Sequence, residues 1–255
     1  MMAVEGPHPR YGYPWRTVLG MAGQALFGGR RSFRADACAC VGRLRPALQL
    51  CGAEHVPTCG PALIAVNHYH RPGFGAWWIA LAVASVVPAE MHWAMTDEWT
   101  CTGRSYAPVG RAGSRWLLRR VAAVYGFTTM PPMPPRSEDA IRRALAVRRL
   151  LEFVRDHPAA VLGLAPEGRD TPDGVLSRPA PGTGHLIRRL ATLGFRIVPA
   201  GAYEQDGRLC LRFGPAYQLE VPPGVSGREA DRLVAQTVMR AIAALLPPSL
   251  RGEFT

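Results

Sequence analysis

The chain has 255 residues and is 48% hydrophobic, which is enough apolar material to bury the core of one α/β domain or two small ones. This composition excludes an intrinsically disordered chain. The formal net charge is +11, and all 30 basic residues are arginine. Two explanations account for the arginine excess equally well. One is a GC-rich coding sequence, and the other is an anionic partner, such as phospholipid headgroups, a nucleotide-bearing cosubstrate or nucleic acid.

The N-terminal residues and the cysteines indicate the compartment. Residues 1–10 lack the hydrophobic region of a signal peptide. The six cysteines follow neither a zinc-binding nor a disulfide-scaffold spacing, so we expect reduced thiols in the cytoplasm. They are Cys38, Cys40, Cys51, Cys59, Cys101 and Cys210.

Residues 15–50 predict one or two helices that are interrupted at Gly28-Gly29. The segment is basic through Arg30, Arg31, Arg34, Arg43 and Arg45. We therefore divide the chain into a helical segment over residues 1–50, which could associate with membranes, and an α/β domain over residues 51–255.

The apolar stretch at 74–88 is shorter than the roughly 20 residues of a membrane span. It predicts a buried or interfacial helix, with shallow membrane insertion as an alternative.

Short apolar runs bounded by turn residues predict five strands. They lie at 61–66, 91–95, 160–164, 196–202 and 208–213. Helical patterns lie between them, which favours a largely parallel or mixed sheet covered by helices on both faces.

Two later helices have recognisable ends. Ser137 is the predicted N-cap of a helix that reaches about residue 155 and presents one apolar face. That face comprises Ala140, Ala144, Val147, Leu151 and Val154. A final amphipathic helix carries Val234, Val238, Ala241 and Leu245 and is stopped by Pro247-Pro248.

Two motifs can carry chemistry. Asn67-His68 follows the apolar run 62–66, and imidazole at the exposed end of a buried strand is suited to act as a general base near neutral pH. About a hundred residues later, a Pro-Glu-Gly turn after a second apolar run can bring Glu167 to the same edge of the sheet. Together they suggest group transfer to a hydroxyl.

These residues resemble the glycerolipid acyltransferases, typified by 1-acylglycerol-3-phosphate acyltransferase. The resemblance is ordered along about residues 40–252. Its matching segments are Gly52–Pro57 with Gly60-Pro61 leading into Asn67-His68, then Ala165–Arg169, Ile197–Ala200, and Ala244–Pro248 with Arg251-Gly252.

The resemblance implies an O-acyltransferase in which His68 takes the proton of an acceptor hydroxyl, whose oxygen attacks the thioester of acyl-CoA or acyl carrier protein. The acceptor would be a lysophospholipid or glycerolipid, as in phospholipid biosynthesis, at the inner face of the cell membrane. No metal and no other cofactor is implied. The predicted substrate-binding residues are Asn67, His70, Glu167, Gly168 and Arg169.

The sequence departs from the family pattern in three places. Gly73 stands where the family has the aspartate that orients the imidazole, and residues 126–132 lack the family's arginine. Arg169 sits one place early in its motif. Another acceptor must therefore orient His68, and the candidates are Asp97 or Glu98, Glu167, or a backbone carbonyl. We expect Glu98 or Asp97, from the end of the next strand, and count both as catalytic.

Each residue also has an ordinary structural explanation. His68 could cap the following helix, Glu167 could brace its own turn, Arg169 could be a surface cation, and Asp97-Glu98 could form a polar loop. A catalytically inactive chain that binds lipid or acyl groups is the alternative function. A nucleic-acid-binding protein is the weakest hypothesis, because the arginines are scattered and no recognition motif is visible. We therefore expect no nucleic-acid partner.

Overall fold

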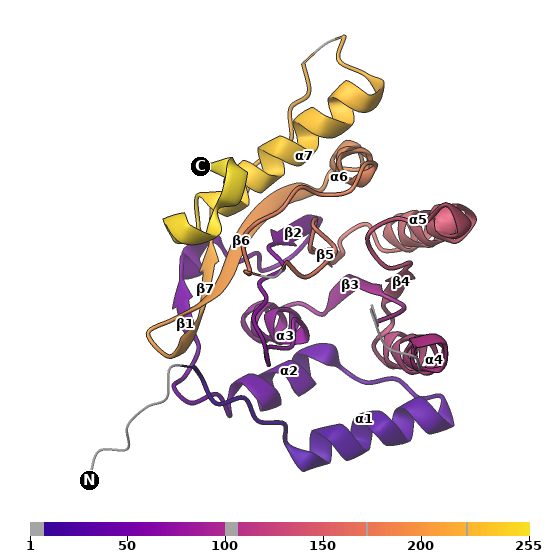
Figure 1. Cartoon of the computed structure of the whole chain (residues 1–255), viewed down its shortest axis with the longest axis vertical. Helices are drawn as coiled ribbons and strands as arrows, with labels where there is room; N and C mark the ends of the chain where they lie inside the picture. The colour runs from indigo at the N-terminus through magenta and orange to yellow at the C-terminus, as the bar shows by residue number, and fades with distance from the viewer. Residues whose placement is uncertain (1–7, 100–106, 172, 223) are drawn as a thin grey trace.

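The computed structural model describes residues 8–99, 107–171, 173–222 and 224–255. Within these residues, seven strands form one sheet in the order β1-β7-β6-β2-β5-β3-β4 (Figure 1). Neighbouring strands are parallel except for the antiparallel pair β6-β7. The strands are β1 Gln49–Cys51, β2 Ala62–Val66, β3 Met91–Thr96, β4 Thr128–Met130, β5 Val161–Leu164, β6 Arg196–Gln205 and β7 Arg208–Phe213.

Seven α-helices connect and cover these strands, again counted over the described residues. Helices α2 and α3 pack on one face of the sheet, and α5, α6 and α7 pack on the other (Figure 1). The predicted α/β architecture is thus confirmed. The helices are α1 Trp15–Phe27, α2 Phe33–Val41, α3 Trp77–Val86, α4 Ala107–Tyr125, α5 Ala140–Asp156, α6 Thr183–Thr192 and α7 Gly227–Ala243.

Strand β2 is buried on both faces, which explains its uninterrupted apolar sequence. Ala62, Ile64 and Val66 belong to the core beneath α2 and α3, whereas Leu63 and Ala65 belong to the opposite core. Successive strand residues point to opposite faces, so every position had to be apolar. The chain becomes polar only at Asn67, where the strand ends at the sheet edge.

The five predicted strands are present, but two short edge strands were not predicted. Strands β1 and β4 have three residues each and form the two edges of the sheet. Their sequences lack a long apolar run because each has only one neighbouring strand. β4 falls in the segment 126–132, which was compared with an acyltransferase motif.

The predicted cap of α5 was wrong, and the predicted apolar face was right only toward the end of the helix. Residues 137–139 form a single 3₁₀ turn, and α5 begins at Ala140, after Asp139. The fully buried face is Ala146, Leu150 and Val154, while Ala140 and Ala144 are exposed. Val154 of the predicted face is thus confirmed as buried and Leu151 packs against the same core, whereas the first turn of the predicted face is exposed.

The N-terminal segment is partly built into the core. Helix α1 ends at the predicted interruption, where Gly28 adopts the left-handed conformation. Phe33 and Ala37 of α2 are buried in the same core as β2 and α3, and the predicted boundary at residue 50 falls inside β1. In the part of the chain that the structure describes, no helix has the length and apolar character needed to cross a membrane.

His92 of β3 is buried and should make the fold sensitive to acid. Its ring stacks on Phe153 at a centroid distance of 3.7 Å, and its Nε2 lies 2.8 Å from Thr128 Oγ1. Burial lowers the pKa of His92 to about 4. Between that pH and about 6.5, an unfolded histidine binds a proton that the folded chain excludes. Stability should therefore fall as pH decreases through this window.

We expect wild-type protein to lose up to about 3 kcal/mol of unfolding free energy through His92 between pH 6.5 and pH 4. His92→Gln removes the titrating group and should flatten this part of the profile. Urea unfolding at a series of pH values measures the difference. His185→Gln, at an exposed position on α6, is the matched control and should retain the wild-type slope. Equal slopes for wild type and His92→Gln would contradict the assignment.

Candidate functional site

The two sequence motifs meet at one edge of the sheet. β2 and β5 are parallel neighbours, with Ala65 paired to Leu164. Three residues beyond that pair, the same register brings His68 opposite Glu167. The carboxyl ends of parallel strands are a common place for functional residues. The sequence prediction that these two residues share an edge therefore agrees with the structure.

Asn67 and Glu167 fix the backbone that carries His68. The side-chain amide of Asn67 donates to Ala202 O at 2.8 Å, and its oxygen accepts from Ala202 N at 2.7 Å. Glu167 Oε2 accepts from His68 N at 2.6 Å, and Oε1 accepts from Ser177 N at 2.7 Å. Both side chains are buried and are fully engaged within the protein. Their geometry supports positioning of His68, and direct substrate contact by either one stays a prediction.

The carboxylate of Glu167 sits in an unusual environment. Burial raises its pKa above the ordinary value, although the backbone N–H groups of His68 and Ser177 act in the opposite direction. A buried carboxylate is stable only when its oxygens are satisfied, as they are here. Glu167 therefore links residues 67–71, here called the histidine loop, to residue 177.

A second brace holds the far end of the histidine loop. Arg71 donates from Nε and Nη2 to the carboxylate of Glu204 at 2.5 and 2.8 Å. Tyr11 Oη donates to the same carboxylate at 2.5 Å. Residues 67–71 are therefore anchored at both ends, by Ala202 of β6 and Glu167 at the start and by Glu204, also of β6, at the end. No sequence motif indicated Arg71 or Glu204, because the two residues are 133 positions apart in the chain.

The carboxylate beside His68 is Asp170. Its Oδ1 lies 3.0 Å from His68 Nδ1 and 3.6 Å from His70 Nδ1. The first pair is at ion-pair distance, but the orientation of the ring nitrogen is not that of a regular hydrogen bond. Interaction with His68 lowers the pKa of Asp170 below its ordinary range. The side chain of His68 is 23% exposed and that of Asp170 is 53% exposed, so solvent and ligands can reach both.

The expectation that Asp97 or Glu98 orients His68 is not what the structure shows. β5 lies between β2 and β3, so the end of β3 is two strand spacings, about 10 Å, from the end of β2. Asp97 accepts from Arg119 and Arg142 at 3.2 and 2.5 Å. Both carboxylates are buried, and neither has His68 among its contacts.

Glu98 is likewise occupied by arginines. It pairs with Arg115, and its Oε1 accepts from Arg136 at 3.1 Å. Burial raises the pKa of Glu98, but these two arginines outweigh burial and hold it below its ordinary value. The two acidic residues therefore link α4, α5 and the preceding loop, which is a structural role.

The remaining predicted residues are close to the site in sequence but differ in exposure. His70 is partly exposed and faces Asp170, whereas Gly168 and Arg169 are exposed in the loop that follows β5. Gly73, which occupies the place of the expected aspartate, offers no side chain. Cys101 lies outside the described residues; the five other cysteines are free thiols. Among the described residues, no cluster of His, Cys, Asp or Glu could hold a metal ion.

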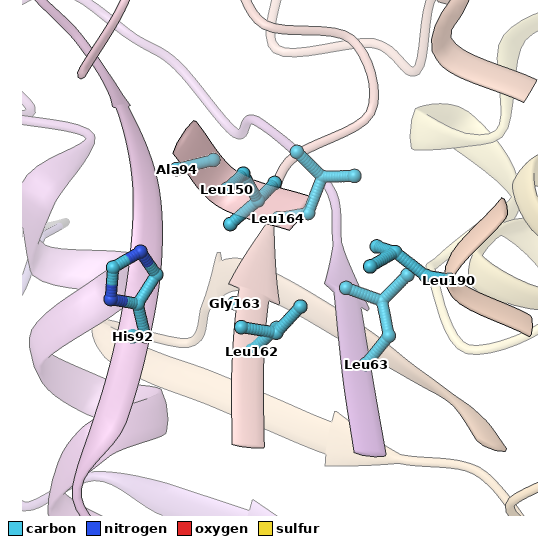
Figure 2. Close-up of a pocket in the computed structure, with 8 residues that line it drawn as sticks. All are labelled: Leu63, His92, Ala94, Leu150, Leu162, Gly163, Leu164 and Leu190. Carbon is cyan, nitrogen blue, oxygen red and sulfur yellow. The ribbon is translucent and has the colours of Figure 1, made fainter. Parts of the chain in front are cut away.

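A small pocket lies between the sheet and helices α5 and α6 (Figure 2). It is lined by His92, Ala94, Gly163 and five leucines: Leu63, Leu150, Leu162, Leu164 and Leu190. Its free volume is about 10 Å³, which is at the lower limit for one water molecule. In this structure it is too small for an acyl chain.

No protein-family model matches the chain, and no curated protein matches it. Among solved structures, it is similar to the 1-acyl-sn-glycerophosphate (LPA) acyltransferase PlsC from Thermotoga maritima. The TM-score is 0.49 and the sequence identity is 13%, covering 90% of this chain and 80% of that chain. Similarity at this level establishes neither a family nor an activity for this chain.

Proposed function

We propose that the chain is an O-acyltransferase. It moves a fatty acyl group from acyl-CoA or acyl carrier protein to the hydroxyl of a lysophospholipid or glycerolipid acceptor. The observation that carries the proposal is His68, held by two backbone braces at the end of β2 with a carboxylate 3.0 Å from its Nδ1. The ordered acyltransferase-like motifs of the sequence supply the reaction class.

His68 can account for the proton transfers of this reaction. With Nδ1 turned toward a carboxylate, Nε2 of His68 is the nitrogen that takes the proton of the acceptor hydroxyl. The resulting oxygen attacks the thioester carbonyl carbon, a C–O bond forms and the C–S bond breaks. The departing thiolate then takes the proton from the imidazolium, which restores neutral His68. Exposed Arg169 is suited to bind a phosphate of the donor or the acceptor, because guanidinium binds phosphate bidentately.

A direct assay tests this proposal. Purified protein is mixed with palmitoyl-CoA or palmitoyl acyl carrier protein and a panel of lysophospholipids and monoacylglycerols. Released thiol and acylated lipid are quantified, the latter by mass spectrometry. We expect thiol release that depends on acceptor and matches the product formed. Donor binding without transfer in every combination would favour the inactive lipid-binding alternative.

We also propose that the protein works at the inner face of the cell membrane and contacts it through α1. Trp15, Leu19 and Leu26 are all more than 60% exposed and, at spacings of four and seven residues, share one face of the helix. Phe27, at the end of the helix, is 90% exposed. An amphipathic helix of this kind can lie in a membrane interface.

The arginines near α1 should contribute less to membrane binding than the sequence suggested. Arg31 is paired with Asp36 at 2.5 Å, and Arg34 donates to Val87 O at 2.9 Å. Apolar contact should therefore dominate, with Arg16 and Arg30 adding attraction to anionic lipid that salt screens.

We expect binding to anionic vesicles to weaken as salt rises and to persist in part on neutral vesicles. Replacing both Leu19 and Leu26 with serine should weaken binding by about tenfold or more, because each buried leucine contributes roughly 1.5–3 kcal/mol. Ile141→Ser is the matched control, since Ile141 is 76% exposed on α5. Vesicle flotation measures all three proteins. Equal binding by the double variant and wild type would exclude α1 as the contact.

A further inference from the structure

We propose that Asp170 is the positioning residue of His68 and takes over the role of the carboxylate that is absent at Gly73. This inference rests on the proposed function, because it names the group that orients the base. Asp170 is in a different loop from Gly73, and it lies 97 residues beyond it in the sequence. The base and its partner therefore come from neighbouring strands instead of from one motif.

The loop that carries Asp170 is tied down at both ends. At its start, Glu167 accepts from His68 N, and with its other oxygen it accepts from Ser177 N at the end of the loop. The backbone N–H of Leu176 donates to Leu250 O at 2.9 Å. A carboxylate on a loop closed in this way is confined near the histidine loop without being buried.

Internal contacts and close packing also restrict this loop. Thr171 Oγ1 donates to Val175 O at 2.8 Å, and Gly174 N donates to Thr171 O at 3.1 Å. A Cβ at Gly174 would lie 2.5 Å from His70 O, so only glycine permits this approach to the histidine loop. The loop is therefore packed directly on the residues that carry the imidazoles.

The chemistry of Asp170 suits orientation of a base. A carboxylate at Nδ1 favours the tautomer with the proton on Nδ1, which leaves the Nε2 lone pair free to accept the substrate proton. In the free protein, His68 Nδ1 and the Asp170 carboxylate do not have the orientation of a regular hydrogen bond. Catalytic hydrogen bonds often tighten only when substrate binds. The negative charge also stabilises the imidazolium formed during transfer. Lowering of the pKa of Asp170 by His68 keeps the carboxylate ionised for this role.

His70 makes the arrangement distinct from a simple pair. Its Nδ1 is 3.6 Å from the same Asp170 oxygen, so one carboxylate faces two imidazoles. The buried carboxylate of Glu167 also contacts His68, through the backbone N–H. Loss of the Asp170 charge would thus act on both histidines, and on His68 most because it is nearer.

Asp170→Asn in the full-length protein tests the proposal. It keeps the shape of the side chain but removes the charge. We expect kcat for acyl transfer to fall by about tenfold or more, less than the loss expected for removal of the base, with little change in KM for the acceptor. The acid limb of the pH–rate profile should move to lower pH, because an imidazolium loses its neighbouring negative charge. Asp173→Asn, an exposed carboxylate of the same loop, should behave like wild type.

Nitrogen-15 NMR of the histidine rings provides a readout that does not require activity. In wild type the His68 signals, assigned by comparison with His68→Gln, should report the Nδ1-protonated tautomer. In Asp170→Asn they should report a mixture of tautomers. A kcat within about twofold of wild type, or an unchanged His68 tautomer, would overturn the role of Asp170. If wild-type protein transfers no acyl group, the proposed function fails, and the NMR comparison alone decides the role of Asp170.

Discussion

His68→Ala should lower kcat/KM for acyl transfer by about 100-fold or more, because general base catalysis contributes roughly 10²–10⁴-fold. The side chain is partly exposed, and the braces of the site use its backbone N–H, not its ring. The fold should therefore survive the change. Product formation at saturating donor and limiting acceptor measures the loss, and circular dichroism checks that the variant is folded.

His185→Ala provides the matched control for this change. His185 is exposed on α6, and the same substitution there should leave turnover within about twofold of wild type. Folded His68→Ala with wild-type turnover would exclude the proposed base. Loss of transfer together with retained binding of acyl-CoA would instead localise the defect to the chemical step.

Apolar patterning predicted much of the fold because the central strands are buried on both faces. β2 and β5 are continuous apolar runs; each begins one residue later than predicted and ends at the predicted residue. β1 and β4 were missed because an edge strand of three residues leaves no periodic signal. The predicted face of α5 was right at Leu151 and Val154 but wrong at Ala140 and Ala144, because alanine carries little information about which side of a helix is buried.

The site was only partly predictable, for a topological reason. His68 and Glu167 lie at the same edge of the sheet because β2 and β5, which precede them, are parallel neighbours. Which carboxylate reaches His68 depends on strand order, and sequence order suggested that the next strand, β3, would lie beside β2. In the structure β5 occupies that place, so the loop after β5 delivers Asp170, while Asp97 remains two strands away.

Glu167→Gln should damage both stability and turnover. Each carboxylate oxygen accepts one backbone N–H, from His68 at 2.6 Å and from Ser177 at 2.7 Å. Glutamine has only one acceptor oxygen, and its NH₂ group would face a backbone donor. Leaving one buried N–H without an acceptor costs about 1–3 kcal/mol. Removing the buried charge offsets part of this cost, since burial already raises the pKa of Glu167.

Urea unfolding at pH 7 should therefore show a lower unfolding free energy for Glu167→Gln, whereas Glu220→Gln, at an exposed position, should match wild type. Turnover should fall by more than stability alone explains, because the same side chain holds the backbone of His68 and closes the loop that carries Asp170. Measuring kcat at a temperature where both variants are fully folded separates the two effects. If folded Glu167→Gln keeps wild-type kcat, Glu167 braces the fold without positioning the base. If kcat falls while KM is unchanged, the two strand ends act as one unit in which Glu167 aligns the histidine with its carboxylate.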